Sequence, residues 1–583
     1  MKIIHLFKDM AENIKNSLQR FPITILLSTA CVILLIYMRE LGFDVDDNFR
    51  EKINKITMIL ALGIPFSLVI KLCFERLSQY SISKLYASYL GGAIVLVLYY
   101  YFLLKDFNMV SITRYTGFTL AFYLIFLFIA YLPNRDNFEL YIVRIFTRFF
   151  TTIIYSVVLF LGVAAILFTL HELLGFNIES NMYYYSWLIV VGVFAPTFFL
   201  AGVPYNTEKL ILQDFPKLLK VLILYIVMPL LTIYTVILYI YFGKIIITTQ
   251  WPQGLVSHLV LWYSVIMTMV LFFISPLRKE NSWANKFMNT LPKLILPLIF
   301  MMFISIGIRI NAYGVTENRY YVVALGIWVL LVMLYFSFAK KIRNIVLLIS
   351  LVIVILISVF SPISSYSISR YSQNKRFVSI LQKNNMIDDN KIIKASGGVS
   401  DEDKNEVSSI IRYFNSNHSL ENLKLLPQDF KIEQMEQVLG FKYSDGYDYN
   451  NDGFFYFNVL RNFNAIDISG YDYLLDSRNG SNNSSNNNPI SMHFDYESGM
   501  VKIEEGEKEV YSKDFTDFAN LVIEKYGVNQ NHEDVLLEDM CFIDENNEIK
   551  VKIQFLNMAG RKNSSTGKIE SKGFEFYILV KLK

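Results

Sequence analysis

Hydrophobic residues come in long blocks over roughly the first 360 positions of the chain. Each block holds 17 to 26 residues, and a short charged stretch separates it from the next. At about 1.5 Å of rise per helical residue, such a block covers a hydrocarbon core of about 30 Å. Lipid offers no hydrogen-bonding partner to the backbone, so each block is predicted to be a membrane-spanning helix.

The blocks predict about eleven spans. Their ranges are Pro22–Met38, Ile56–Phe74, Tyr86–Leu104, Tyr115–Leu132, Phe149–Leu170, Tyr183–Val203, Leu218–Gly243, Leu255–Ser275, Leu291–Ile308, Tyr320–Ala339 and Ile342–Phe360. Pro65, Pro196, Pro229 and Pro297 fall inside spans, where a missing N–H and a bulky ring predict kinks or breaks.

The pattern changes after Pro362. Residues 371–418 are polar with helical spacing, and Asp401 begins a stretch that resembles a capped helix start. Aromatic and β-branched residues then predict strands, with one further helix at about 514–526. The predicted strands are Phe454–Leu460, Ile466–Leu475, Ile490–Phe494, Met500–Glu504, Glu548–Leu556 and Phe574–Leu582. We therefore predict a polytopic α-helical membrane bundle at residues 1–361 and a soluble α+β domain at residues 362–583.

Composition agrees with this division. The chain is 54% hydrophobic and 18% charged, with a mean hydropathy of +0.37, which excludes a purely soluble protein. The net charge of only +3 gives no reason to expect nucleic acid as a partner. The partner that the sequence does imply is a lipid bilayer. The three cysteines form neither a disulfide framework nor a zinc motif.

The loop charges predict an orientation. Loops on the N-terminal side of the membrane hold about twenty Lys and Arg residues, against about nine in the other short loops, and basic loops stay in the cytoplasm. We therefore expect a bacterial cytoplasmic (inner) membrane protein with a cytoplasmic N-terminus. An odd number of spans then puts the C-terminal domain outside. One span more or fewer would reverse that side.

Unusual polar residues collect at the predicted outer ends of the spans. The candidate ligand-binding residues are His171, Glu172, His258, Arg309, Tyr313, Glu317, Asn318 and Arg319. One interpretation is an outward-facing pocket for a small anionic or zwitterionic ligand, since ionisable groups at membrane depth are costly. The other is that these side chains reach the interface, or pair to hold the helices and the tail together.

Two further motifs are incomplete. Asp44, Asp46 and Asp47 in the first outer loop resemble the carboxylates that enzymes acting on lipid-linked substrates place there, although the loop is short. Residues 448–453 place oxygen ligands at Asp448, Asn450 and Asp452, as in a calcium-binding EF-hand loop, without its final glutamate. A turn leading into the next strand explains that motif equally. No P-loop, GxGxxG, HExxH, GxSxG or kinase signature appears, so the sequence leaves the cofactor, if there is one, unknown.

Residues 309–320 resemble the signature of an uncharacterised bacterial family of multi-pass membrane proteins, the domain of unknown function numbered forty-one fifty-three. The similarity extends to other stretches along the chain. These are Asn134–Asp136, Phe199–Pro204, Trp251–Pro252, Ser361–Pro362 with Ser372–Gln373, and Ser469–Tyr473. The resemblance implies a membrane location and no activity, and it draws attention to the loop from Tyr313 to Arg319.

Three functions remain open on the sequence. The first is a non-enzymatic protein that senses, binds or scaffolds through its outer domain, with envelope proteins or a small anionic or lipid-linked ligand as partners. The second is a transporter or flippase, suggested by the proline-containing spans. The third is a transferase acting on a lipid-linked substrate at the outer leaflet.

Overall fold

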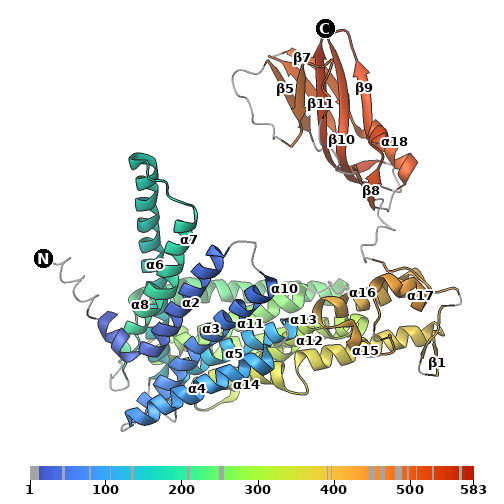
Figure 1. Ribbon diagram of the computed structural model, residues 1–583. Coiled ribbons are helices and arrows are strands. Elements are labelled where there is room, and N and C mark those ends of the chain that lie inside the picture. The colour runs from blue at the N-terminus through green and yellow to red at the C-terminus, as the bar shows by residue number, and fades with distance from the viewer. Residues whose placement is uncertain are drawn as a thin grey trace. The chain divides into compact units, whose positions relative to one another are not determined.

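The protein is represented by a computed structural model that describes most of the chain as two compact units, Met1–Tyr443 and Ser444–Lys583. The described residues are 12, 14–41, 46–77, 81–104, 107–132, 137–205, 211–248, 255–389, 391–395, 397–427, 429–444, 454–459, 466–478, 489–495, 498–506, 508–527, 531–563 and 568–583. Figure 1 shows the helices of the first unit and the strands of the second.

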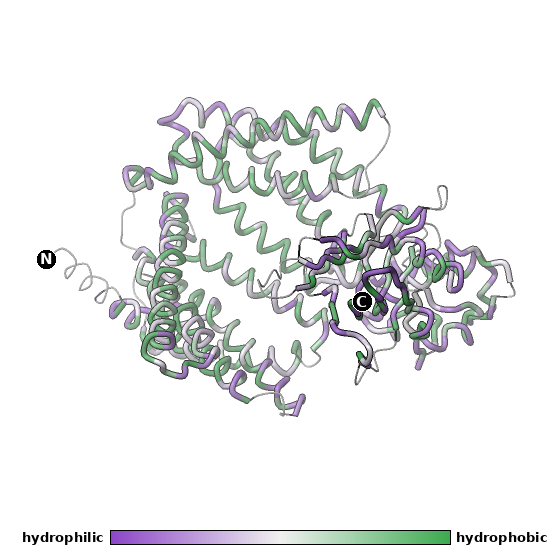
Figure 2. Tube along the Cα trace, turned by 90° about the horizontal axis from the view of Figure 1, so that it is seen from above, coloured by the Kyte–Doolittle hydropathy of each residue, from purple (hydrophilic) through white to green (hydrophobic). Residues whose placement is uncertain are grey.

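Within the described residues of the first unit, ten helical segments are long and apolar enough to cross a membrane. They are α2 (Pro22–Glu40), α3 (Asp47–Glu75), α4 (Ile82–Leu103), α5 (Met109–Ile129), α6 (Phe138–Leu174), α7 (Asn181–Ile189) with α8 (Ala195–Ala201), α9 (Lys217–Val221) with α10 (Met228–Thr248), α11 (Leu255–Ile274), α12 (Ser282–Tyr313) and α13 (Glu317–Phe338). Figure 2 shows hydrophobic residues along most of their lengths. The chain is thus a multi-pass membrane protein.

An eleventh candidate span is α14 (Ile345–Phe360), which bends by 47° into α15 (Ser365–Lys383). With 16 residues, α14 is the shortest of the candidates that are not interrupted. The prediction of a helical bundle with about eleven spans is therefore confirmed, with ten or eleven depending on how α14 and α15 are counted.

Among the described residues, two spans contain a π-helical turn that ends two residues before a proline. Val190–Phe194 precedes Pro196, and Leu222–Val227 precedes Pro229. A proline lacks the N–H for an α-helical bond and crowds the preceding turn, so a wider turn lets the helix continue. In contrast, Pro297 lies inside α12, which remains one continuous helix. Pro65 likewise lies inside α3, which is continuous. Of the four prolines predicted to disturb spans, Pro196 and Pro229 follow an interruption of the α-helix, and Pro65 and Pro297 do not.

Polar contacts join helix ends at one end of the bundle. Arg20, before α2, pairs with Glu75 at the end of α3 at 2.8 Å and donates to the Val203 carbonyl after α8 at 2.6 Å. Asn344, before α14, donates to Glu139 at the start of α6 at 2.7 Å. We call this the first end.

A second set of contacts marks the opposite end. Tyr185 in α7 donates to Glu40 at the end of α2, and Tyr366 in α15 donates to the Met109 carbonyl at the start of α5 at 3.1 Å. Because α14 begins beside the first end and leads to Tyr366, it runs the length of the bundle. We call this the second end.

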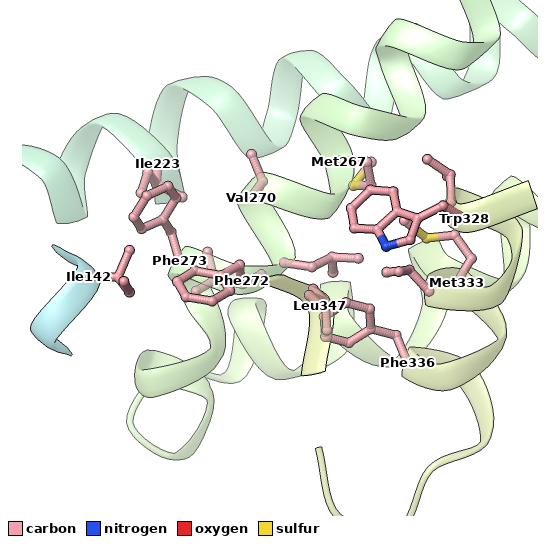
Figure 3. Close-up of a cluster of buried hydrophobic side chains, with 14 of the residues drawn as sticks. Ile142, Ile223, Met267, Val270, Phe272, Phe273, Trp328, Met333, Phe336 and Leu347 are labelled. Carbon is pink, nitrogen blue, oxygen red and sulfur yellow. The ribbon is translucent and has the colours of Figure 1, made fainter. Parts of the chain in front are cut away.

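The bundle is held together by a continuous apolar core. Figure 3 shows Met267 of α11 beside Trp328 of α13, and Phe273 of α11 on the side of Ile142 and Ile223, all within this core. The Trp328 indole donates to the Ser350 hydroxyl at 3.0 Å, so its one polar atom is satisfied within the bundle. Side-chain packing and a few interhelical hydrogen bonds are what drive helix association in lipid.

Residues 365–443, here called the juxtamembrane segment, belong to the same compact unit as the bundle. The segment contains α15, a short hairpin of β1 (Ile387–Asp388) and β2 (Lys391–Ile392), α16 (Asp401–Asn417) and α17 (Met435–Leu439). It has its own core, in which Phe377, Ile411 and Phe414 are fully buried. Ser400 accepts a hydrogen bond from the Asp403 N–H at 3.2 Å, which confirms the capped helix start.

The second unit consists of two sheets and a helix, α18 (Thr516–Tyr526). The larger sheet has the order β4-β11-β10-β3-β8, with β9 also paired to β10, and the smaller has the order β5-β6-β7. The strands are β3 (Phe454–Val459), β4 (Tyr473–Asp476), β5 (Ile490–Asp495), β6 (Met500–Glu505), β7 (Lys508–Asp514), β8 (Asn531–Val535), β9 (Cys541–Glu545), β10 (Ile549–Lys562) and β11 (Ile569–Leu582). This confirms the predicted α+β architecture after the bundle.

One predicted strand is shorter than expected. The range Ile466–Leu475 forms a strand only from Tyr473, because Asp467 accepts the Ser469 N–H at 2.9 Å and Gly470 has a φ of +83°. Such a side-chain-capped turn competes with strand pairing. Aspartate followed by serine and glycine was the sequence signal for it.

Candidate functional site

The loop between α12 and α13 is fixed onto α15. The Gln373 amide donates to the carbonyls of Tyr313 and Val315, each at 3.0 Å, and the Ser372 hydroxyl accepts the Val315 N–H at 2.9 Å. Gly314 has a φ of +68°, and a Cβ there would lie 2.9 Å from the Gln373 Nε2. The close approach and the left-handed conformation both require glycine at this position.

Glu317 is the first residue of α13, and its carboxylate accepts hydrogen bonds from the juxtamembrane segment. It accepts hydrogen bonds from the Ser369 hydroxyl of α15 at 2.7 Å and the Tyr413 hydroxyl of α16 at 2.7 Å. The His418 Nε2 lies 3.0 Å from the same carboxylate. Only 14% of the Glu317 side chain and 4% of the His418 side chain are exposed. Charge-assisted hydrogen bonds of this kind are about twice as strong as neutral ones.

The protonation of this group follows from its geometry. An ionised carboxylate can only accept, so the His418 Nε2 facing it carries a hydrogen. Burial, and then the hydrogen bond to Glu317, raise the pKa of Tyr413 well above its ordinary value, which keeps its hydroxyl protonated and donating. With three donors directed at it, the carboxylate is engaged within the protein and is not positioned as a general base.

Arginines surround the same loop. Arg319 donates to the carbonyls of Tyr313 and Gly314 at 2.9 and 2.6 Å. The guanidinium groups of Arg319 and Arg376 lie 5.6 and 5.8 Å from the centre of the Tyr313 ring, within the range of cation–π attraction. The Arg309 Nε is buried and has no hydrogen-bond partner in the described part of the protein. The structure thus gathers Tyr313, Glu317 and Arg319 from the predicted candidates.

The other candidates lie apart from this group. The His171 Nδ1 is 3.0 Å from the Phe176 carbonyl at the exposed end of α6, next to the exposed Glu172. His258 is exposed on α11 and lines an open, mainly apolar groove of about 520 Å³ with Trp262. Asn318 is exposed beside Glu317. No described contact links His171, Glu172 or His258 to the Glu317 carboxylate.

The incomplete motifs contribute little to the described site. Asp46 caps α3 by accepting the Asn48 N–H at 3.2 Å, whereas Asp44 lies outside the described residues. The candidate calcium ligands Asp448, Asn450 and Asp452 also lie outside them. Over the described residues, no group of three or more His, Cys, Asp or Glu side chains is placed to hold a metal ion.

A polar cavity lies beside this group, between the start of α5 and the juxtamembrane segment. Its volume is about 310 Å³. Arg114 of α5 and Arg370 of α15 line it, together with His418 and the amide side chains of Asn417 and Asn422. His418 therefore has two neighbours, the Glu317 carboxylate and the cavity. Charged and amide side chains that converge on a cavity are typical of a binding site for a polar ligand.

Sequence reasoning missed several of these residues. Ser369, Tyr413 and His418 lie in the polar tail, where polar and ionisable side chains are common, so nothing in their type distinguished them. One signal was present: Ser372 and Gln373 belong to a stretch that resembles the family signature, and they hold the loop from Tyr313 to Val315. Ser369 and Tyr413 lie 52 and 96 positions after Glu317 in the sequence. The local pattern of apolar residues cannot predict contacts between residues so far apart.

Comparison with known proteins identifies the family. A family model described as Domain of unknown function (DUF4153) matches residues 23–390, which include the bundle and α15. An uncharacterized protein of Pasteurella multocida (strain Pm70) is 23% identical over 351 residues, covering 59% of this chain and 58% of that protein. The chain thus spans less than two thirds of that relative's length. No solved structure matches. Because the family model covers more than half of the chain and nearly all of the bundle, this multi-pass membrane protein belongs to the DUF4153 family.

Proposed function

We propose that the chain is a non-enzymatic binding protein of the bacterial inner membrane, in which the juxtamembrane segment passes binding events on the outer side to the helical bundle. The observation that carries this proposal is the buried Glu317 carboxylate. This carboxylate accepts hydrogen bonds from α15, from α16 and from His418, and Glu317 is also the first residue of α13. Any displacement of α16 therefore acts directly on a membrane helix.

The loop charges support the orientation in this proposal. The first end carries the more basic loops, which favours a cytoplasmic position. Since α14 starts beside that end and finishes beside Tyr366 at the second end, counting it as a span gives eleven crossings. The juxtamembrane segment and the C-terminal unit are then outside the cytoplasm.

A pair of reporters fused after Lys583 tests this orientation. We expect alkaline phosphatase to be active at this position, because it folds only outside the cytoplasm. Green fluorescent protein should be dark there, because it does not become fluorescent when it is exported as an unfolded chain. A fusion after Lys340, at the first end of α13, serves as the control and should give the reverse result. Fluorescence after Lys583 without phosphatase activity would place the tail inside and overturn the orientation.

Replacement of Glu317 by alanine tests the coupling. Each lost hydrogen bond to a charged group costs about 1.5–3 kcal/mol, so amide hydrogen exchange in α16 of the full chain should become at least about tenfold faster. Glu317→Gln keeps one acceptor oxygen and should have a smaller effect. Hydrogen exchange followed by mass spectrometry on the detergent-solubilised protein measures this.

Glu421→Ala is the matched control for this experiment. It removes the same charge from an exposed position of the juxtamembrane segment and should leave exchange in α16 unchanged. If α16 kept its full protection in Glu317→Ala, the carboxylate would not couple the segment to α13, and the proposed function would lose its basis.

A further inference from the structure

The polar cavity contains a positive charge that the protein does not neutralise. Arg114 lies in the second turn of α5, one of the membrane-spanning helices, and is partly buried. Its guanidinium contacts the Val359 carbonyl at 3.4 Å and lies 5.7 Å from the centre of the Phe360 ring. It forms no ion pair with a carboxylate in the described part of the chain. A charge at this depth is costly unless water or a counter-ion reaches it.

A second guanidinium lines the same cavity from the juxtamembrane segment. Arg370 of α15 donates to the Asn422 side chain at 2.7 Å, which orients it, and it also has no carboxylate partner among the described residues. None of the residues that line the cavity is acidic. The two arginines therefore leave a net positive charge in the cavity.

The surrounding groups add to this positive potential. The cavity includes Asn108 and Ser111 at the start of α5, where the helix dipole presents its positive end. Asn108 accepts the Ser111 N–H at 2.9 Å, so the helix start is already ordered without a ligand. Asn417 and Asn422 supply neutral amide groups, which can donate to an anion.

One edge of the cavity is apolar. Phe102, at the end of α4, lines it and is 77% exposed. Since aromatic side chains concentrate where a membrane meets water, this position is consistent with the level of the lipid headgroups. The cavity thus combines an apolar edge with two cationic walls.

We propose that this cavity binds a phosphate group, held between Arg114 and Arg370. Guanidinium groups match the geometry of phosphate oxygens and bind them in pairs. A volume of about 310 Å³ exceeds what a lone carboxylate needs and admits a phosphate with part of its substituent. The phosphate comes either from a lipid headgroup or from a free solute. This assignment deepens the proposed binding function, on which it rests, by naming the ligand class.

The test uses the full chain in a neutral detergent and in nanodiscs. The probes are inorganic phosphate in detergent, and nanodiscs of pure phosphatidylcholine or of phosphatidylcholine mixed with phosphatidic acid. We expect one probe to raise the thermal midpoint of the natural protein. The Arg114→Gln and Arg370→Gln variants should each bind that probe about tenfold or more weakly, because each loses a charge-assisted hydrogen bond.

Arg370 is exposed, so Arg370→Gln should fold even if Arg114→Gln does not, and Arg114→Lys should restore part of the affinity. The variant Lys340→Gln removes the same single charge from an exposed position at the first end of the bundle and should bind like the natural protein. A response to inorganic phosphate indicates a free solute, and a response only to phosphatidic acid indicates a headgroup.

Two results would overturn the proposal. One is the absence of a response to either probe, and the other is an equal response in the natural protein and in Arg370→Gln. If exchange in α16 still depended on Glu317 in those cases, only the ligand class would be wrong. If that dependence were also missing, the proposed binding function would fail as well.

Discussion

Replacing Phe555 by alanine is expected to lower the unfolding free energy of the unit Ser444–Lys583 by about 3–5 kcal/mol. Phe555 lies in β10 and is fully buried. Its ring centre is 5.0 Å from that of Phe515, 5.3 Å from that of Phe518 and 5.6 Å from that of Phe576. The alanine would leave a cavity among the rings of Phe576 in β11, Phe518 in α18 and Phe515 directly before α18, which stiff strands cannot close.

The measurement is urea unfolding of residues 444–583 expressed alone. This unit has its own apolar core, so it should unfold cooperatively. A loss of 3–5 kcal/mol is a large share of the roughly 5–15 kcal/mol that stabilises a domain. Leu521→Ala on α18, where the side chain is 62% exposed, is the control and should change stability by less than about 0.5 kcal/mol. Equal effects of the two substitutions would contradict the described core.

The second large effect is expected at the first end of the bundle, where Glu75→Ala should cost about 3–5 kcal/mol. Glu75 forms a bidentate pair with Arg20. The Arg20 Nε lies 3.1 Å from one Glu75 oxygen, and an Arg20 Nη lies 2.8 Å from the other. Their side chains are only 7% and 15% exposed. The substitution would leave the Arg20 charge with the Val203 carbonyl as its closest partner and with the Tyr205 ring 4.0 Å away.

This effect is measured as a fall in the thermal midpoint of the full chain in detergent. The double variant Arg20→Met with Glu75→Met should recover part of the loss, because it removes the Arg20 charge together with its partner, whereas Lys71, whose Nζ lies 3.6 Å from Glu75, keeps its charge. Asp401→Asn weakens an exposed pair with Lys404 and should leave the midpoint unchanged. A double variant as unstable as Glu75→Ala would show that the unpaired Arg20 charge is not what dominates the loss at this end.

The amino-acid sequence by itself determined the membrane-spanning part of this protein. Lipid imposes one requirement on every span, about 20 apolar residues in a helix, so hydropathy alone located the helices. The ends differ from the prediction because helices extend past the lipid: Phe149–Leu170 was predicted, and α6 covers Phe138–Leu174. The side chains that flank a span do not follow the apolar pattern and so could not mark these ends.

The sheets of the second unit were predictable only in part. The long strands β10 and β11 carry apolar residues at alternate positions over 548–556 and 574–582, the ranges that were predicted, and extend beyond them in the structure. In contrast, β7 has only Val510 and Tyr511 as apolar residues, and its pairing with β6 makes it a strand. Strand formation at a sheet edge depends more on the neighbouring strand than on local preference.

Only the tertiary structure decided which polar residues share a site. The sequence drew attention to Tyr313, Glu317 and Arg319 together with His171 and His258, because all five lie at predicted outer helix ends. Folding brings the first three to Ser369, Tyr413 and His418 and leaves the two histidines elsewhere. Hydropathy reports the depth of a residue in the membrane and carries no information about its position around the bundle. That position follows from how helices distant in sequence pack against one another.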